Sequence, residues 1–80
     1  MATAKFSRDV AASALCARVG RKIRGLREKR GWTQQILADH AQIERSHLAR
    51  VEEGIREPGI MILERIADAL EVPVWELLRV

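Results

Sequence analysis

Apolar residues recur at spacings of three and four along most of the chain, which is the signature of helices with one buried face. The first such series consists of Leu15, Val19, Ile23 and Leu26. We expect this helix to run from about Arg8 to Arg30, where Gly31 can supply a left-handed stop. A shorter helix preceded by a separate turn is an alternative. Residues 1–7 are small or polar and are expected to be disordered.

Two short helical patterns follow, joined by a tight connection. In the first, Ile36, Leu37 and Ala41 stand at helical spacing. Thr33 is a good N-cap for this helix, which we place at Gln34–His40. A second helix is expected at Arg45–Glu53, with Leu48 and Val51 directed inward and Gly54 at its end. Residues 33–54 therefore form a two-helix unit.

The remainder of the chain predicts two more helices. Pro58 and Gly59 break the chain before a fourth apolar face, made of Ile60, Leu63, Ile66, Ala67 and Leu70. Pro73 suits the first turn of a short last helix that continues through Arg79. No segment combines two-residue alternation with β-branched enrichment. We therefore expect an all-α fold: one compact five-helix domain over residues 8–80, whose core unit is 33–54.

Composition adds limits on the class of protein. Eighty residues with 48% hydrophobic content suffice for one small domain with a core. The chain has no run of 18 apolar residues, and charged residues interrupt its beginning, so we expect neither a membrane span nor a signal peptide. The single Cys16 can form neither an internal disulfide nor a thiolate metal site alone, which fits a cytoplasmic protein.

Positive charge is concentrated in one segment, although the net charge is only +3. Residues 18–30 hold seven basic residues and a single acid, Glu28, whereas residues 31–80 hold five basic and nine acidic ones. A basic segment on an otherwise acidic domain is a candidate footprint for a polyanion. The alternative is a solvated helix face.

The helix expected at 45–53 carries the candidate chemistry. Its free face holds Arg45, Ser46, His47 and Arg50, and a short helix of this kind suits the major groove of DNA. Arg45 is placed to donate to guanine O6 and N7; the alternatives are a phosphate contact or an ion pair with Glu44 or Asp39. Arg50 is placed to read a base or hold a phosphate, unless it pairs with Glu53. His47 is the weaker candidate, because a lone surface histidine is more often only polar.

Four segments in this order, VGRKIRGLREKRG, WTQQILADHA, RSHLARVEEG and EPGIMILERIADALEVPVWELL, resemble the phage-repressor and Cro class of helix-turn-helix proteins, the xenobiotic-response-element family. The resemblance spans roughly Val19–Leu78, and restriction–modification controller proteins look most similar. It implies a lambda-repressor-like DNA-binding domain. The expected function is a sequence-specific transcriptional regulator that binds a (pseudo)palindromic operator as a homodimer, with the 45–53 helix in the major groove.

The resemblance also assigns roles to residues outside that helix. It implies phosphate contacts from Thr33, Gln34, Lys29 and Arg56, and a structural ion pair between Arg27 and Glu52. The last helix is the family's usual dimer surface, which implies interface roles for Val74, Trp75 and Leu78; otherwise these three complete the core. The chain departs from the family pattern at three positions. Gln42 replaces the usual turn glycine, Glu44 replaces a Ser or Thr cap, and Glu71 follows the fourth helix.

Two other classes of function, an antitoxin and an enzyme, are the alternatives to a transcriptional regulator. An antitoxin would bind a partner protein as well as DNA, using the segment Phe6–Leu15 for docking. An enzyme is not expected, because His40, His47 and Cys16 are the only candidate ligands or nucleophiles besides carboxylates and hydroxyls, and no metal or phosphate-loop motif occurs. We therefore expect double-stranded DNA and a second copy as partners, with no metal, cofactor, membrane or small-molecule effector.

Overall fold

The computed structural model describes the backbone of residues 2–80 and the side chains of residues 14–80. Within this part the chain forms helices only: α1 (Ala2–Lys29), α2 (Gln34–Ala41), α3 (Arg45–Glu53), α4 (Ile60–Leu70) and α5 (Val74–Leu77). The all-α, five-helix prediction is confirmed. None of the helices described is both long and apolar enough to cross a membrane.

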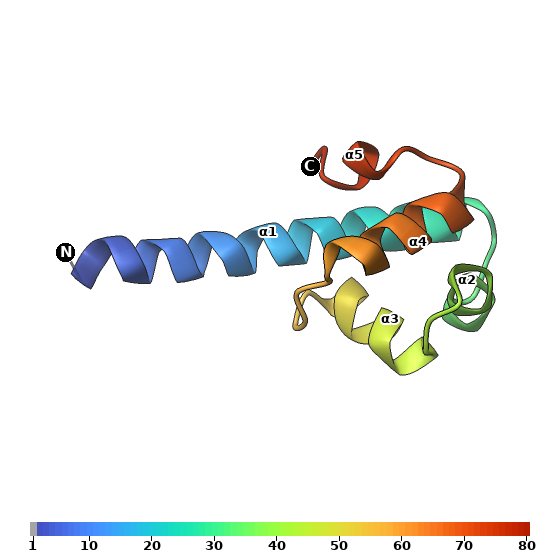
Figure 1. The fold of residues 1–80 in the computed structure, drawn as a ribbon, viewed down its shortest axis with the longest axis horizontal. Coiled ribbons are helices and arrows are strands. Elements are labelled where there is room, and N and C mark those ends of the chain that lie inside the picture. Colours follow the sequence, from blue (N-terminus) through green and yellow to red (C-terminus); the bar gives the residue numbers. More distant parts are fainter. Residues whose placement is uncertain (1) are drawn as a thin grey trace.

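The first helix is the element that differs most from expectation. It is continuous from Ala2, so residues 2–7 form its first turns instead of a disordered tail; Met1 lies outside the described residues. Alanines at 2, 4, 11, 12 and 14 favour helix throughout this segment. A helix of 28 residues is about 42 Å long, and the molecule measures 44 × 23 × 20 Å. The N-terminal half of α1 therefore projects from the domain (Figure 1).

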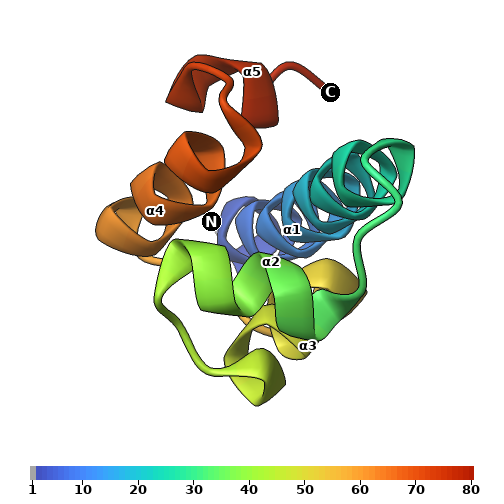
Figure 2. The same cartoon turned by 90° about the vertical axis from the view of Figure 1, so that its right-hand side faces the viewer.

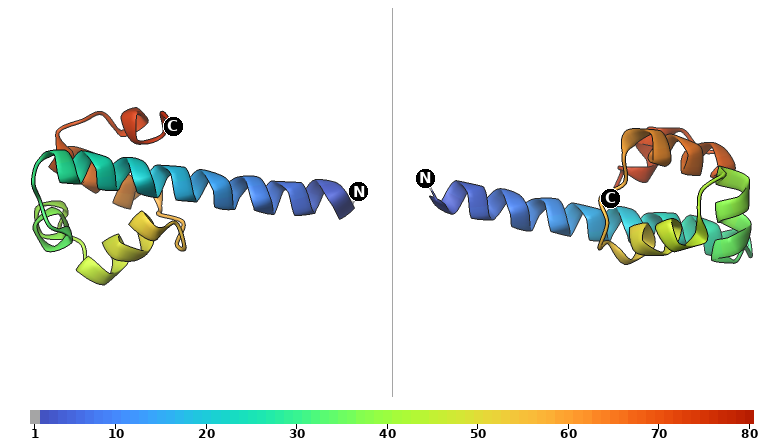
Figure 3. Two further views of the ribbon diagram at one scale, coloured as in Figure 1. Left: turned by 180° about the vertical axis from the view of Figure 1, so that it is seen from behind. Right: turned by 60° about the horizontal axis from the view of Figure 1, so that its bottom comes forward.

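The other four helices gather around the C-terminal half of α1. Seen nearly along α1, α5 lies above it, α4 to its left, and α2 and α3 below (Figure 2). α1 packs on α3, α4 and α5, while α2 packs on α3 and α4. Both further views show α2 and α3 on the same end of the molecule, far from the N-terminus (Figure 3).

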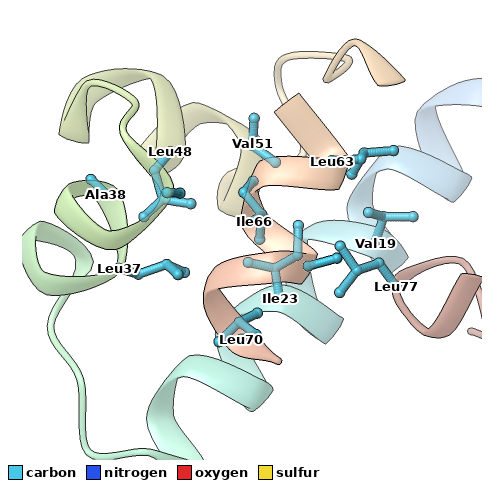
Figure 4. Packing of buried hydrophobic residues seen from close by; sticks show 12 residues of the cluster. Val19, Ile23, Leu37, Ala38, Leu48, Val51, Leu63, Ile66, Leu70 and Leu77 are labelled. Atoms are coloured by element: carbon cyan, nitrogen blue, oxygen red, sulfur yellow. The ribbon is translucent and has the colours of Figure 1, made fainter. Parts of the chain in front are cut away.

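One apolar core joins all five helices (Figure 4). Its fully buried members are Ile23, Leu37, Leu48, Val51, Ile66, Leu70 and Leu77. Three residues that we expected on apolar faces are instead exposed: Leu15 at 41%, Ile36 at 39% and Ile60 at 77%. Ile36 lies beside the inward face of α2, which is formed by Leu37, Ala38 and Ala41. Leu15 and Ile60 lie on apolar faces that continue beyond the packed core.

Helices α1 to α4 all end in a residue with left-handed backbone geometry. Glycine takes this place after α1 and α3, but Gln42 and Glu71 take it after α2 and α4, with φ of 58° and 59°. The amide of Ile43 donates to the Ala38 carbonyl at 3.0 Å, and that of Val72 donates to the Ala67 carbonyl at 3.0 Å. These bonds close the helix ends in the Schellman manner. The turn after α2 therefore keeps its usual geometry without glycine.

Replacing Gln42 with glycine should raise the free energy of unfolding by about 0.5–1 kcal/mol. The left-handed conformation costs a non-glycine residue about 1–2 kcal/mol, and the greater freedom of glycine in the unfolded chain cancels part of the gain. Thermal unfolding of Gln42→Gly and of the control Gln42→Ala measures the effect. The alanine variant keeps the strained backbone and should show no gain; equal stabilisation of both variants would contradict the strain at this turn.

The last helix is shorter than expected. It is held in place by one buried apolar residue and by one ion pair to α1. α5 ends at Leu77 instead of Arg79, and Pro73 is its N-cap instead of a residue of its first turn. Leu77 is fully buried. Lys22 Nζ lies 3.0 Å from Glu76 Oε2, and its hydrogen bond lowers the pKa of the Glu76 carboxyl. Lys22 therefore holds α5 against α1.

Candidate nucleic-acid interface

The α2–α3 unit is fixed in place by its caps and by its inward side chains. Thr33 Oγ1 accepts a hydrogen bond from the Ile36 amide at 3.2 Å, as expected of the N-cap of α2. Leu48 and Val51 are buried, so they hold one face of α3 against the core. The opposite face of α3 is therefore directed outward.

Three of the four expected base-reading residues of α3 are exposed, Ser46 and Arg50 on this outward face and Arg45 at the first turn of the helix. Within the described side chains, neither arginine forms an ion pair, so the alternatives with Glu44, Asp39 and Glu53 are not realised. Asp39 instead accepts a hydrogen bond from Gln35 Nε2 at 2.8 Å. The two guanidinium groups are left free to meet an anion or a base edge.

His47 differs from these three residues. It is half-buried, and its Nε2 is buried without a hydrogen-bond partner in the described structure. Its position next to Leu48 places it at the boundary between the two faces of α3. This nitrogen is not presented to solvent, so the structure separates His47 from the exposed group.

The start of α3 lacks a side-chain cap, as the sequence indicated. Glu44 takes the N-cap position with φ −72° and ψ 140°, and its side chain makes no capping hydrogen bond. Its carbonyl accepts from the Leu48 amide at 3.1 Å, so the helix begins normally. Because Glu44 is exposed beside Arg45, a negative charge stands next to the reading face.

A buried charged network joins α1, α2 and α3 behind this face. Arg27 Nε lies 2.7 Å from Glu52 Oε2, and Arg27 Nη2 donates to Glu52 Oε1 at 2.9 Å, which gives a two-bond pair. Their side chains are only 9% and 2% exposed. Arg27 Nη1 also donates to the Trp32 carbonyl at 2.8 Å, and Gln34 Nε2 donates to Glu52 Oε1 at 3.0 Å. Hydrogen bonding to Glu52 raises the pKa of Arg27, whose guanidinium is charged in proteins in any case.

The expected phosphate-contact residues fall into two groups. Lys29 and Arg56 are exposed and belong to none of the ion pairs in the described part of the chain. Thr33 and Gln34 stand at the start of α2, but their side chains already form hydrogen bonds within the domain. Thr33 caps the helix, and Gln34 donates to Glu52. A phosphate at this position would meet the Gln34 backbone and not a freely extended amide.

The basic segment of α1 is less available to a polyanion than its composition suggested. Lys22, Arg24, Arg27 and Arg30 pair with Glu76, Glu28, Glu52 and Glu71, respectively. Arg30 also donates to the Leu70 carbonyl at 2.8 Å, so it stabilises the C-terminal end of α4. Of the seven cations only Arg18, Arg21 and Lys29 have no ion pair in the described structure. Three cations of the basic segment, Lys22, Arg27 and Arg30, therefore hold α1 or its C-terminal end against other helices.

One cluster beside the unit was not anticipated from the sequence. The rings of Trp32 and His40 stack with centroids 4.5 Å apart and an interplanar angle of 5°, and the Arg30 guanidinium lies 5.1 Å from the Trp32 ring centre. The stack ties the α1–α2 connection to the outer side of α2. Helical spacing does not predict this contact, because Trp32 lies before α2 and His40 lies in the last turn of α2. His40 thus has a packing role.

Two short helices at a fixed angle, with an outward polar face on the second, define a helix-turn-helix domain. The chain belongs to the family described as helix-turn-helix domain, whose family model matches residues 18–79. This is a family of DNA-binding domains and not of enzymes, in agreement with the expectation from the sequence.

Known relatives of the chain are regulators. It is 37% identical over 59 residues to the competence pilus inhibition repressor of Acinetobacter baylyi, covering 74% of this chain and 54% of that protein. It is 38% identical over 58 residues to the uncharacterised HTH-type transcriptional regulator YazB of Bacillus subtilis, covering 72% and 84%. The first four curated relatives are longer, and the chain spans between 39% and 55% of their length.

Solved structures show the same fold. The restriction-modification controller protein C.AhdI from Aeromonas hydrophila superposes with a TM-score of 0.78 at 31% identity, covering 80% of this chain and 97% of that one. The family model begins at residue 18 and so leaves out the N-terminal half of α1. The projecting part of α1 is therefore additional to the shared domain.

Proposed function

We propose that this chain is a sequence-specific DNA-binding transcriptional regulator that inserts α3 into the major groove. The observation that carries the proposal is that α3 exposes the side chains of Arg45, Ser46 and Arg50. The same helix is held in place because Leu48 and Val51 are buried in the core. Arginine pairs with guanine edges, and a serine hydroxyl can pair with several bases. The names of the relatives, a repressor and an HTH-type regulator, support the same conclusion.

The proposed complex contains two copies on a (pseudo)palindromic operator. Half-sites about one helical turn of DNA apart, roughly 34 Å, would each receive one α3. Val74, Trp75 and Leu78 support a dimer, because they are 36%, 60% and 50% exposed and therefore do not simply complete the core. Thr33, Gln34, Lys29 and Arg56 would hold the phosphates on either side. Such a regulator would act in the cytoplasm, and a controller of a restriction–modification operon is one version, supported by the likeness to C.AhdI.

Selection of bound fragments from genomic DNA, followed by fluorescence anisotropy on the selected site, tests this function. Lys29 and Arg56 from both copies would neutralise at least four phosphates, so the logarithm of the binding constant should fall with the logarithm of salt concentration with a slope of roughly −4 or steeper. A slope near zero, or no enrichment of any sequence, would refute DNA binding by this surface.

Arg45→Ala should weaken operator binding by about 1–3 kcal/mol and relax the preference at one base pair in each half-site. Anisotropy against single-base operator variants measures both effects. Arg24→Ala is the control, because Arg24 is an exposed arginine that pairs only with Glu28 on the same helix. An equal loss on every sequence would assign Arg45 to a phosphate instead of a base.

A further inference from the structure

Exposed apolar side chains gather where α1 leaves the domain. Apart from Ile36, the large exposed apolar residues among the described side chains belong to three segments: α1, the α3–α4 connection with the start of α4, and the C-terminal segment. They are Leu15, Ile55, Ile60, Met61, Val74, Trp75, Leu78 and Val80. Figure 1 shows the α3–α4 connection and the C-terminus at the same level along α1. The apolar faces of α1 and α4 thus continue past the core toward this level.

A groove lies within this surface. It is lined mainly by apolar atoms of Leu15 and Cys16 of α1, Pro58, Leu63 of α4 and Leu78, the residue after α5, and we call it the root groove. Its volume of about 140 Å³ is close to that of an apolar cavity able to hold a benzene ring. One large apolar side chain of a partner would fill it.

The α5 surface alone is too small for a stable dimer. A specific interface buries about 800 Å² on each partner, whereas a completely buried tryptophan contributes only about 150–250 Å². α5 has only four residues, and Trp75 is 60% exposed, so only this part of its accessible area is available to a partner. The missing area must come from the neighbouring surface, and Leu78, the exposed residue directly after α5, also lines the root groove.

We propose that the root groove is covered by a second copy of this chain, with the projecting half of the partner's α1 lying across it. The proposal rests on the homodimer proposed above and extends its interface from α5 to α1. In a two-fold symmetric dimer the same patch serves both partners, so it must offer a projection and a matching hollow. This chain carries the two side by side, because Leu15 and Cys16, which line the groove, stand where the projecting half of α1 begins.

Charge favours the same occupant. Glu57 is exposed and lines the root groove, and it forms no ion pair in the described structure. The projecting segment of α1 includes two basic residues, Lys5 and Arg8, and one acid, Asp9. A helix with this net positive charge therefore suits a groove whose exposed charge is a carboxylate.

The experiment compares self-association with the reactivity of Cys16, the chain's single cysteine. Sedimentation velocity at micromolar concentrations measures the dimer, and the rate of reaction with Ellman's reagent measures access to the root groove. We expect dimer formation to slow the Cys16 reaction at least about tenfold at high protein concentration, with recovery on dilution. Leu15→Glu should weaken dimerisation by about tenfold or more. Arg21→Glu is the control, because Arg21 is exposed on the C-terminal half of α1 and does not line the groove.

The outcomes separate this proposal from the dimer itself. A dimer in which Cys16 reacts equally at all concentrations, and in which Leu15→Glu has no effect, overturns the root-groove proposal and leaves a dimer through α5. A monomer at all concentrations, with or without operator DNA, overturns both. Protection of Cys16 only by a different, co-purifying small protein overturns the second copy and favours the antitoxin class. If circular dichroism shows that Leu15→Glu does not fold, Glu57→Lys gives the same comparison, because Glu57 is exposed, lines the groove and lies outside the α5 surface.

Discussion

Replacing Glu52 with alanine should lower the free energy of unfolding by about 3–5 kcal/mol, the usual cost of removing one partner from a buried ion pair. The substitution leaves the Arg27 guanidinium with the Trp32 carbonyl alone and removes the acceptor of the Gln34 amide. A domain of this length has a total stability of only about 4–12 kcal/mol. The melting temperature should therefore fall by about 15 °C or more, measured by circular dichroism.

Glu53→Ala provides a matched control, since Glu53 is the next residue on the same helix but is exposed. Its melting temperature should change by only a few degrees. Replacing both partners, as in Arg27→Met with Glu52→Leu, should recover much of the loss, because no uncompensated charge then stays buried. If Glu52→Ala melted at the same temperature as Glu53→Ala, the network would not be holding the helices together.

The bounds of α3, the bounds of α2 to within one residue and the start of α4 could be predicted because their signals are local. Thr33 caps one helix, Gly54 ends another, and Pro58 with Gly59 separates the third from what precedes it. Each of these residues acts on its own few neighbours, so no knowledge of the tertiary structure is needed. The outward position of Ser46 and Arg50 follows equally from the inward positions of Leu48 and Val51, whereas Arg45 is exposed because it stands at the first turn of α3.

Properties that depend on distant partners could not be read from spacing. Periodicity shows that Leu15 shares a face with Val19, but it does not show where the neighbouring helices end, so the exposure of Leu15 was not predicted. The charge of Lys22 is evident from the sequence, whereas its partner Glu76 lies on α5, far along the chain. For the same reason the basic segment suggested a larger surface for DNA than the structure leaves free.

Gln42 and Glu44 show that a departure from a family pattern need not change local geometry. Gln42 adopts the left-handed conformation that glycine usually takes, and the Ile43 amide still closes the end of α2. Glu44 begins α3 with an ordinary extended N-cap backbone although its side chain makes no bond. The backbone of the turn is therefore retained at a small cost in stability.

Gly20 was given no role by the sequence, yet replacing it with alanine should be among the most damaging single changes in the chain. A Cβ at this position would lie 2.5 Å from both the Val51 and the Glu52 carbonyl oxygens and 2.9 Å from the Glu52 carbonyl carbon. Since these are backbone atoms of α3, no side-chain rotation relieves the overlap. Overpacking of this kind costs about 1–3 kcal/mol and more where the backbone cannot move, so we expect a loss of at least about 3 kcal/mol.

Gly25→Ala on the same helix is the control, because a Cβ there would meet no atom within 4 Å. Alanine should stabilise the exposed middle of α1 by about 0.5–1 kcal/mol, so the two substitutions should move the melting temperature in opposite directions. Gly20→Ala should also weaken operator binding at temperatures where the domain is still folded, since separating α1 from α3 tilts the helix that carries Arg45 and Arg50. Equal melting temperatures for the two variants would show that α1 and α3 do not approach this closely at Gly20.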